Sequence, residues 1–72
     1  MKKETYLEVF DSRNTATVKD LHHASHPLLV LDAARKESRI EGVYKVSAYR
    51  NGAWNQYEKG VMTEWSYPEG IL

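Results

Sequence analysis

Three closely spaced histidines, His22, His23 and His26, are the first residues of this chain that could do chemistry. Imidazole nitrogens bind zinc and nickel, and on a helix His22 and His26 would share a face because four positions separate them. The run Ser25-His26-Pro27 is instead typical of a helix start, which leaves the histidines in a loop. Only Asp20 adds a nearby carboxylate, and the chain has no cysteine. We therefore expect a solvated turn here, with no metal and no other cofactor.

A second group of chemically active side chains is basic. Arg35, Lys36 and Arg39 could contact the phosphates of a nucleic acid. The same residues fall near the end of an expected helix, where cations complement the helix dipole, and we favour this structural interpretation. The ten basic and ten acidic residues of the chain give a formal net charge of zero. This balance argues against strong nonspecific nucleic-acid binding, which depends on a surplus of positive charge.

Two carboxylates, Glu58 and Glu64, could be considered as a pair for acid–base catalysis. The strand register expected below places them on opposite faces of a sheet, so they fail the geometric requirement for such a pair. The sequence also contains no phosphate-binding loop and no serine nucleophile motif. We therefore predict a protein that is not an enzyme.

The first half of the chain is expected to form a hairpin and a helix. Residues 5–10 are β-branched and aromatic and predict a strand, and residues 15–18 predict a second strand that pairs with it. Residues 19–23 could instead form a short helical turn. Residues 28–38 favour a helix that ends before a glycine, although the apolar run at its start could also be a buried strand.

The second half predicts an antiparallel meander. Asn51-Gly52 is a strong signal for a two-residue hairpin turn, because both residues tolerate positive φ. It connects strands over residues 43–50 and 53–58, and Lys59-Gly60 leads into a third strand over residues 61–67. We expect a single α+β domain over residues 1–72, of order ββαβββ, with the helix packed on one face of the sheet.

The two turns also predict which side chains share a face. A tight turn at Asn51-Gly52 pairs Tyr49 with Trp54, and one at Lys59-Gly60 places Trp65 beside Trp54. The helix is then expected to cover Tyr44, Val46, Ala48, Tyr57 and Met62. The other face would carry a partner-binding row of aromatic anchors with a polar rim, formed by Tyr49, Trp54, Trp65 and Tyr67 with Lys45, Arg50 and Glu58. Two alternatives stay open: the tryptophans could be core residues, and a β-bulge would invert part of this assignment.

The order of elements resembles a known group of proteins. A leading hairpin, an Ala-Ala-Arg-Lys-Glu helix, a glycine and an Asn-Gly-x-Trp-x-x-Tyr hairpin are similar to small phage anti-CRISPR proteins of the type I-F class, through Ala33, Ala34, Gly42, Asn51, Gly52, Trp54 and Tyr57. Phage inhibitors of host RNA polymerase share a comparable layout. The resemblance implies stoichiometric inhibition of a large host complex. Members that mimic nucleic acid are often strongly acidic, so this neutral chain favours contact through a mixed, aromatic surface.

The leading hypothesis is therefore a cytoplasmic inhibitor or adaptor that binds a host protein or ribonucleoprotein complex. A small nucleic-acid-binding module, using the sheet aromatics with Arg35, Lys36 and Arg39, is one alternative, and a self-associating homodimer is another. We expect no membrane association, because the longest apolar run, Leu28–Leu31, is far below the ~20 residues that span a bilayer. The leading Met1-Lys2-Lys3 is not followed by an apolar stretch and does not predict a signal peptide.

Overall fold

The computed structural model describes residues 4–72, so the expectation about Met1-Lys2-Lys3 lies outside the described residues. The chain forms five strands and one helix in the predicted ββαβββ order. The elements are β1 (Thr5–Asp11), β2 (Ala16–Asp20), α1 (Pro27–Ser38), β3 (Val43–Arg50), β4 (Ala53–Glu58) and β5 (Val61–Trp65). The α+β class is thereby confirmed, and the ends of β3 and β4 agree with the predicted boundaries.

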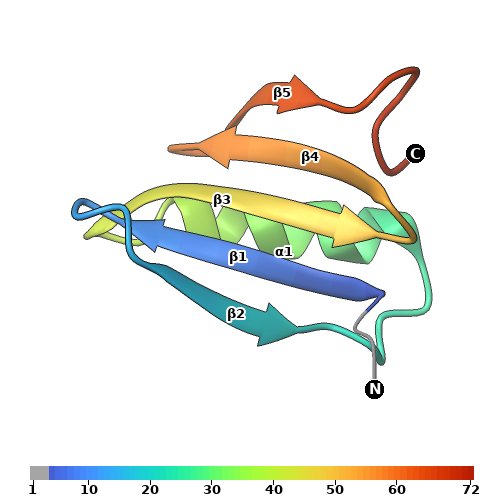
Figure 1. Cartoon of the computed structure of the whole chain (residues 1–72), viewed down its shortest axis with the longest axis horizontal. Coiled ribbons are helices and arrows are strands. Elements are labelled where there is room, and N and C mark those ends of the chain that lie inside the picture. Colours follow the sequence, from blue (N-terminus) through green and yellow to red (C-terminus); the bar gives the residue numbers. More distant parts are fainter. Residues whose placement is uncertain (1–3) are drawn as a thin grey trace.

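All five strands form one antiparallel sheet in the order β2-β1-β3-β4-β5 (Figure 1). The predicted hairpin between the first two strands is confirmed, since β1 pairs with β2 over residues 6–10 and 16–20. The alternative of a helical turn over residues 19–23 is wrong at Lys19 and Asp20, which lie in β2. Helix α1 crosses behind the sheet and returns the chain to β3 on the other side of β1 (Figure 1).

Helix α1 begins and ends where the sequence predicts. His26 is the N-cap, with extended backbone and an imidazole Nδ1 that accepts the Leu28 amide hydrogen at 3.1 Å. Pro27 occupies the first turn, where its missing N–H leaves no bond unmade. The last turn carries Arg35 and Lys36, as the dipole argument requires. Residues 28–31 are therefore helical, and the strand alternative for them is wrong. As the one helix of residues 4–72, α1 is neither long nor apolar enough to cross a membrane.

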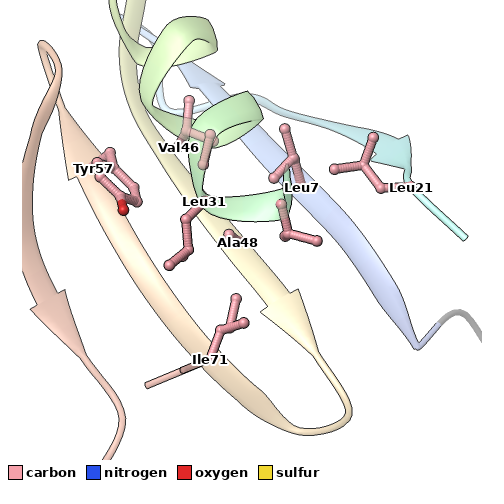
Figure 2. Packing of buried hydrophobic residues seen from close by; sticks show 9 residues of the cluster. Leu7, Leu21, Leu31, Val46, Ala48, Tyr57 and Ile71 are labelled. Atoms are coloured by element: carbon pink, nitrogen blue, oxygen red, sulfur yellow. The ribbon is translucent and has the colours of Figure 1, made fainter. Parts of the chain in front are cut away.

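The core lies between α1 and one face of the sheet (Figure 2). It consists of aliphatic side chains from the helix, the three central strands, and the segments before and after them, together with one tyrosine: Leu7, Leu21, Val30, Leu31, Ala34, Val46, Ala48, Tyr57 and Ile71. The expected core face of the meander is thus confirmed for Val46, Ala48 and Tyr57. Tyr44 and Met62, expected in the same core, lie near strand ends and are exposed.

Both predicted hairpin turns have the expected backbone. Asn51 and Gly52 have φ values of 51° and 88°, and Lys59 and Gly60 have 50° and 82°, as two-residue turns with positive φ require. The register between β3 and β4 agrees with the prediction, with Arg50 opposite Ala53 and Tyr49 opposite Trp54. The first two pairs of β4–β5 also follow the prediction, with Glu58 opposite Val61 and Tyr57 opposite Met62.

A β-bulge then changes the rest of β5. Gln56 pairs with Glu64 and Asn55 with Trp65, so Thr63 is an extra residue with no partner of its own on β4. The prediction that Trp65 pairs with Trp54 is therefore wrong by one position. The same bulge places Glu64 opposite Gln56 on the face that also carries Glu58, which corrects the expectation that these two carboxylates lie on opposite faces.

The C-terminal segment folds back against the helix-covered face of β4. The Ile71 amide donates to Asn55 Oδ1 at 2.8 Å, and Asn55 Nδ2 donates to the Met62 sulfur at 2.9 Å. Ile71 is buried and belongs to the same core cluster as Leu31, and both are labelled in Figure 2. Gly70 has a φ of 67°, and a Cβ at this position would lie 2.5 Å from Asn55 Oδ1. The buried Asn55 amide thus holds the end of the chain in place.

Candidate functional site

The sheet has a second face that α1 does not cover (Figure 1). Leu7, Val46 and Ala48 pack in the core, so their neighbours along each strand lie on the opposite side. This opposite side is called here the aromatic face. It is formed by Tyr6, Phe10, Tyr49 and Trp54, with Glu8, Lys45, Ser47, Gln56 and Glu58 between them.

Three aromatic side chains form a row across β1, β3 and β4. Tyr6 pairs with Tyr49, which pairs with Trp54 on its other side. The rings of Tyr6 and Tyr49 stack with centroids 4.8 Å apart and planes 16° from parallel. Such offset stacking contributes about 0.5–1.5 kcal/mol beyond area burial. The row is therefore held in place by the sheet and by ring contact.

A carboxylate lies beside this row. Partial burial raises the pKa of the Tyr49 hydroxyl above its ordinary value of 10.0, and the neighbouring Glu8 carboxylate raises it further. Both effects disfavour the tyrosinate, so Tyr49 keeps its proton and can donate a hydrogen bond at neutral pH.

The next row is polar. Glu8, Ser47 and Gln56 pair across the same three strands, and Glu64 extends the row onto β5. Ser47 is only 6% exposed although no helix covers it, because it lies at the centre between the longer side chains of Glu8 and Gln56. Beyond this row, the Lys45 ammonium lies 4.9 Å from the centre of the Phe10 ring, within cation–π range.

An open hollow of about 360 Å³ adjoins the row at the β4–β5 edge, and Trp54, Thr63, Glu64 and Trp65 line it. These four residues are called the tryptophan hollow. The bulge creates it, because the extra residue Thr63 brings Glu64 level with Gln56 and Trp65 level with Asn55. The Thr63 hydroxyl lies 3.4 Å from the Gln56 carbonyl oxygen and the same distance from Gln56 Nε2, which ties the bulge to β4.

The residues predicted to bind a partner are only partly brought together. Tyr49, Trp54, Lys45 and Glu58 lie on the aromatic face, as predicted. Trp65 borders the tryptophan hollow and is 47% exposed, but the bulge pairs it with Asn55 and so turns it to the helix side of the sheet, which makes its predicted place in the row wrong. Two further residues fall outside the predicted row. Tyr67 follows the end of β5 and is 96% exposed, and Arg50 takes a helix-side position opposite Ala53.

The other chemical candidates of the sequence do not form part of this face. Asp32 Oδ1 and Oδ2 accept from Arg35 and Lys36 at 3.1 and 3.0 Å, and these bonds lower the pKa of the Asp32 carboxyl. Arg35 and Lys36 belong to α1, and Arg39 caps its end, so the basic group lies on the far side of the sheet from the aromatic face.

The histidines have local partners. His22 Nδ1 lies 3.0 Å from Asp20 Oδ2, and the His22 ring meets the His23 ring edge-on at 5.5 Å between centroids. His26 uses its Nδ1 to cap α1. Within residues 4–72 no cluster of three metal-ligating side chains forms.

Charge on the aromatic face is predominantly negative. Glu8, Glu58 and Glu64 lie on it, and Asp20 extends its aromatic row onto β2, whereas Lys45 is its cation. A phosphate backbone would meet these carboxylates unfavourably. Stacked rings, an indole and carboxylates together favour a partner that offers apolar and basic side chains.

Two aromatic residues of this face, Tyr6 and Phe10, were not among the predicted site residues. The sequence contains a signal that identifies them, because Leu7 and Val9 alternate with Tyr6, Glu8 and Phe10 along the first strand. The alternation separates an aliphatic face from an aromatic and acidic one. What it does not reveal is that β1 lies directly beside β3, which places Tyr6 against Tyr49.

A comparison with known proteins finds no family model, no curated protein and no solved structure that matches this chain.

Proposed function

We propose that this protein is a small, non-enzymatic binding protein that occupies a surface of a larger protein or ribonucleoprotein complex through its aromatic face. In the form that the sequence resemblance suggests, it is a phage-encoded cytoplasmic inhibitor that blocks a host complex such as a CRISPR effector. The observation that carries the proposal is the row Tyr6, Tyr49 and Trp54 on the sheet face that α1 leaves uncovered.

The composition of this face supports a protein partner. Binding energy at protein interfaces concentrates on tyrosine, tryptophan and arginine side chains surrounded by polar residues. Here the rings of Tyr6 and Tyr49 are already stacked, so little side-chain freedom remains to be lost on binding. Glu8, Gln56 and Glu58 supply hydrogen-bond acceptors around them.

The arrangement of charges favours a protein over a nucleic acid. A nucleic-acid module would combine base-stacking aromatics with phosphate-binding cations on one surface. In this chain Arg35 and Lys36 lie on α1 and are each paired with Asp32, while the aromatic face carries mainly carboxylates. The two halves of such a site are on opposite sides of the sheet.

The test is binding of candidate complexes by the purified chain and by single-residue variants. We expect Trp54→Ala to abolish binding to the partner while circular dichroism and thermal unfolding show a folded protein. Leu29→Ala is the matched control, because Leu29 is also a large exposed hydrophobic residue but belongs to α1, on the other side of the sheet.

Equal loss of binding in both variants, or full binding by Trp54→Ala, would refute the assignment of the aromatic face. A type I-F CRISPR effector complex and host RNA polymerase are the first candidates to mix with the chain, followed by size-exclusion chromatography. Formation of a stable complex with either one would support the inhibitor hypothesis and identify the partner.

A further inference from the structure

The tryptophan hollow differs from the rest of the aromatic face because an indole and a carboxylate, those of Trp54 and Glu64, share it, while Trp65, which pairs with the helix-side Asn55, borders it at the edge of the sheet. Trp54 comes from β4, and Trp65 and Glu64 come from β5. The volume of about 360 Å³ is at the small end of the range of about 300–1,000 Å³ for ligand pockets. The hollow is also open at the surface, so it suits one projecting side chain better than an enclosed small molecule.

The chemistry of the lining selects a cation. Indole faces carry the negative part of the ring quadrupole, and tryptophan is the strongest cation–π partner among the side chains. Glu64 adds a full negative charge, and among residues 4–72 it makes no ion pair. Lys45, the cation of this face, is already placed over Phe10. An anionic ligand would meet the unpaired carboxylate without compensation.

Among cations, a guanidinium fits these groups best. It is planar and weakly hydrated, so it stacks on an indole at a smaller desolvation cost than an ammonium. Its parallel N–H groups can also bond both oxygens of a carboxylate. Glu64 and the Trp54 indole therefore offer an acceptor and a stacking surface to the same group.

We propose that the tryptophan hollow receives the guanidinium of an arginine side chain on the partner protein, stacked on indole and paired with Glu64. The assignment rests on the proposed function in naming a protein partner. The hollow itself belongs to the isolated chain, so its ligand preference can be measured without that partner.

The experiment is a titration of the isolated chain with N-acetyl-arginine amide, followed by the indole N–H signals in nuclear magnetic resonance spectra. The chain has two tryptophans: Trp54 shares the face of Glu64 and reports directly on the site, and Trp65 borders the hollow and reports on its edge. We expect the Trp54 signal to shift more than the Trp65 signal, with saturation in the millimolar range. N-acetyl-citrulline amide, a neutral molecule of nearly the same shape, should leave them unchanged.

Two variants test whether the negative charge of Glu64 contributes to arginine binding. Glu64→Gln should weaken arginine binding by about three- to fivefold, the upper part of the range of about 1.4- to fivefold for an exposed ion pair. Glu41→Gln removes an equally exposed carboxylate from the turn between α1 and β3, and it should bind arginine as the wild type does.

Three outcomes would overturn the proposal: no shift with arginine, equal shifts with citrulline, or an unchanged affinity in Glu64→Gln. A shift produced by oligothymidine in place of arginine would also overturn it and would favour the nucleic-acid alternative. Failure here leaves the proposed function standing if Trp54→Ala still loses a protein partner. Conversely, arginine binding with no dependence of partner binding on Trp54 would refute the proposed function and the assignment of the arginine to the partner, and would leave only the ligand preference of the hollow.

Discussion

The contact between Asn55 and the C-terminal segment gives a quantitative test of the fold. Asn55 is 2% exposed, and its Oδ1 accepts the Ile71 amide hydrogen at 2.8 Å. Asn55→Ala leaves that amide without its partner beside the core. Gly70→Ala disrupts the same contact, because the new Cβ would lie 2.5 Å from Asn55 Oδ1. The φ of residue 70 is 67°, which is also unfavourable for alanine.

The expected magnitudes follow from these contacts. Leaving a buried donor unpaired costs about 1–3 kcal/mol, so we expect Asn55→Ala to lower the free energy of unfolding by about 2 kcal/mol. Gly70→Ala adds about 1–2 kcal/mol for left-handed backbone to the loss of the same hydrogen bond, about 3–4 kcal/mol together. In the double variant the Asn55 side chain is absent, so the steric conflict disappears and only the backbone cost is added. The double variant should therefore be about 2 kcal/mol more stable than the sum of the single effects predicts.

Urea denaturation followed by circular dichroism measures all four proteins. A chain of this length is expected to have a total stability of about 4–11 kcal/mol, so each single change is a large part of it. With a denaturant dependence of about 1 kcal/mol per molar urea, Asn55→Ala should lower the midpoint by about 2 M. If the two changes add to within about 0.5 kcal/mol, Asn55 and Gly70 do not share a contact and the placement of the C-terminal segment is wrong.

Three further changes test other parts of the structure. His26→Ala removes the cap acceptor of α1 and should cost about 1 kcal/mol in thermal unfolding, whereas His26→Ser should restore most of it. Ser38 is 1% exposed and its hydroxyl accepts the Gly60 amide hydrogen at 2.9 Å, so Ser38→Ala should cost about 1–3 kcal/mol in urea denaturation; an effect below about 0.5 kcal/mol would contradict this contact. The pKa of Tyr49 is raised above 10.0, so folding stability from this group is complete below that pH and is lost as the pH rises through the raised value. Burial raises the pKa of Tyr57 as well, so absorbance of tyrosinate should show more than one late-titrating tyrosine; Tyr49→Phe should remove one of them, and Glu8→Gln should shift that one to lower pH.

Local signals in the sequence predict most of this fold because its elements are joined by turns with strict backbone requirements. Asn51-Gly52 fixes a two-residue turn, and the turn fixes the pairing of Tyr49 with Trp54. The N-cap of α1 is likewise determined by neighbouring residues, through His26 and Pro27. In both places the interactions that decide the structure lie within a few positions of one another.

The errors arise where distant residues decide the structure. The bulge at Thr63 has no turn residue to mark it, and it displaces Trp65 by one position. On the helix side of the same two strands, Asn55 is hydrogen-bonded to Met62 and Ile71, which lie 7 and 16 positions away in the sequence. The pairing of β1 with β3, which adds Tyr6 to the aromatic row, also depends on a chain reversal through α1. A short stretch of sequence predicts neither the register of β5 after the bulge nor the pairing of β1 with β3.

The bulge has a consequence for the outer edge of the sheet. Strand β5 is five residues long and exposed throughout, and one of its sides pairs with no other strand of residues 4–72. A bare edge of this kind is a template on which the strand of another molecule can add and start aggregation. Because Thr63 is inserted in the middle of β5, the spacing of its outward hydrogen-bonding groups is interrupted, and a regular strand cannot pair along its whole length. The residue that shapes the tryptophan hollow thus also protects this edge from sheet-to-sheet aggregation.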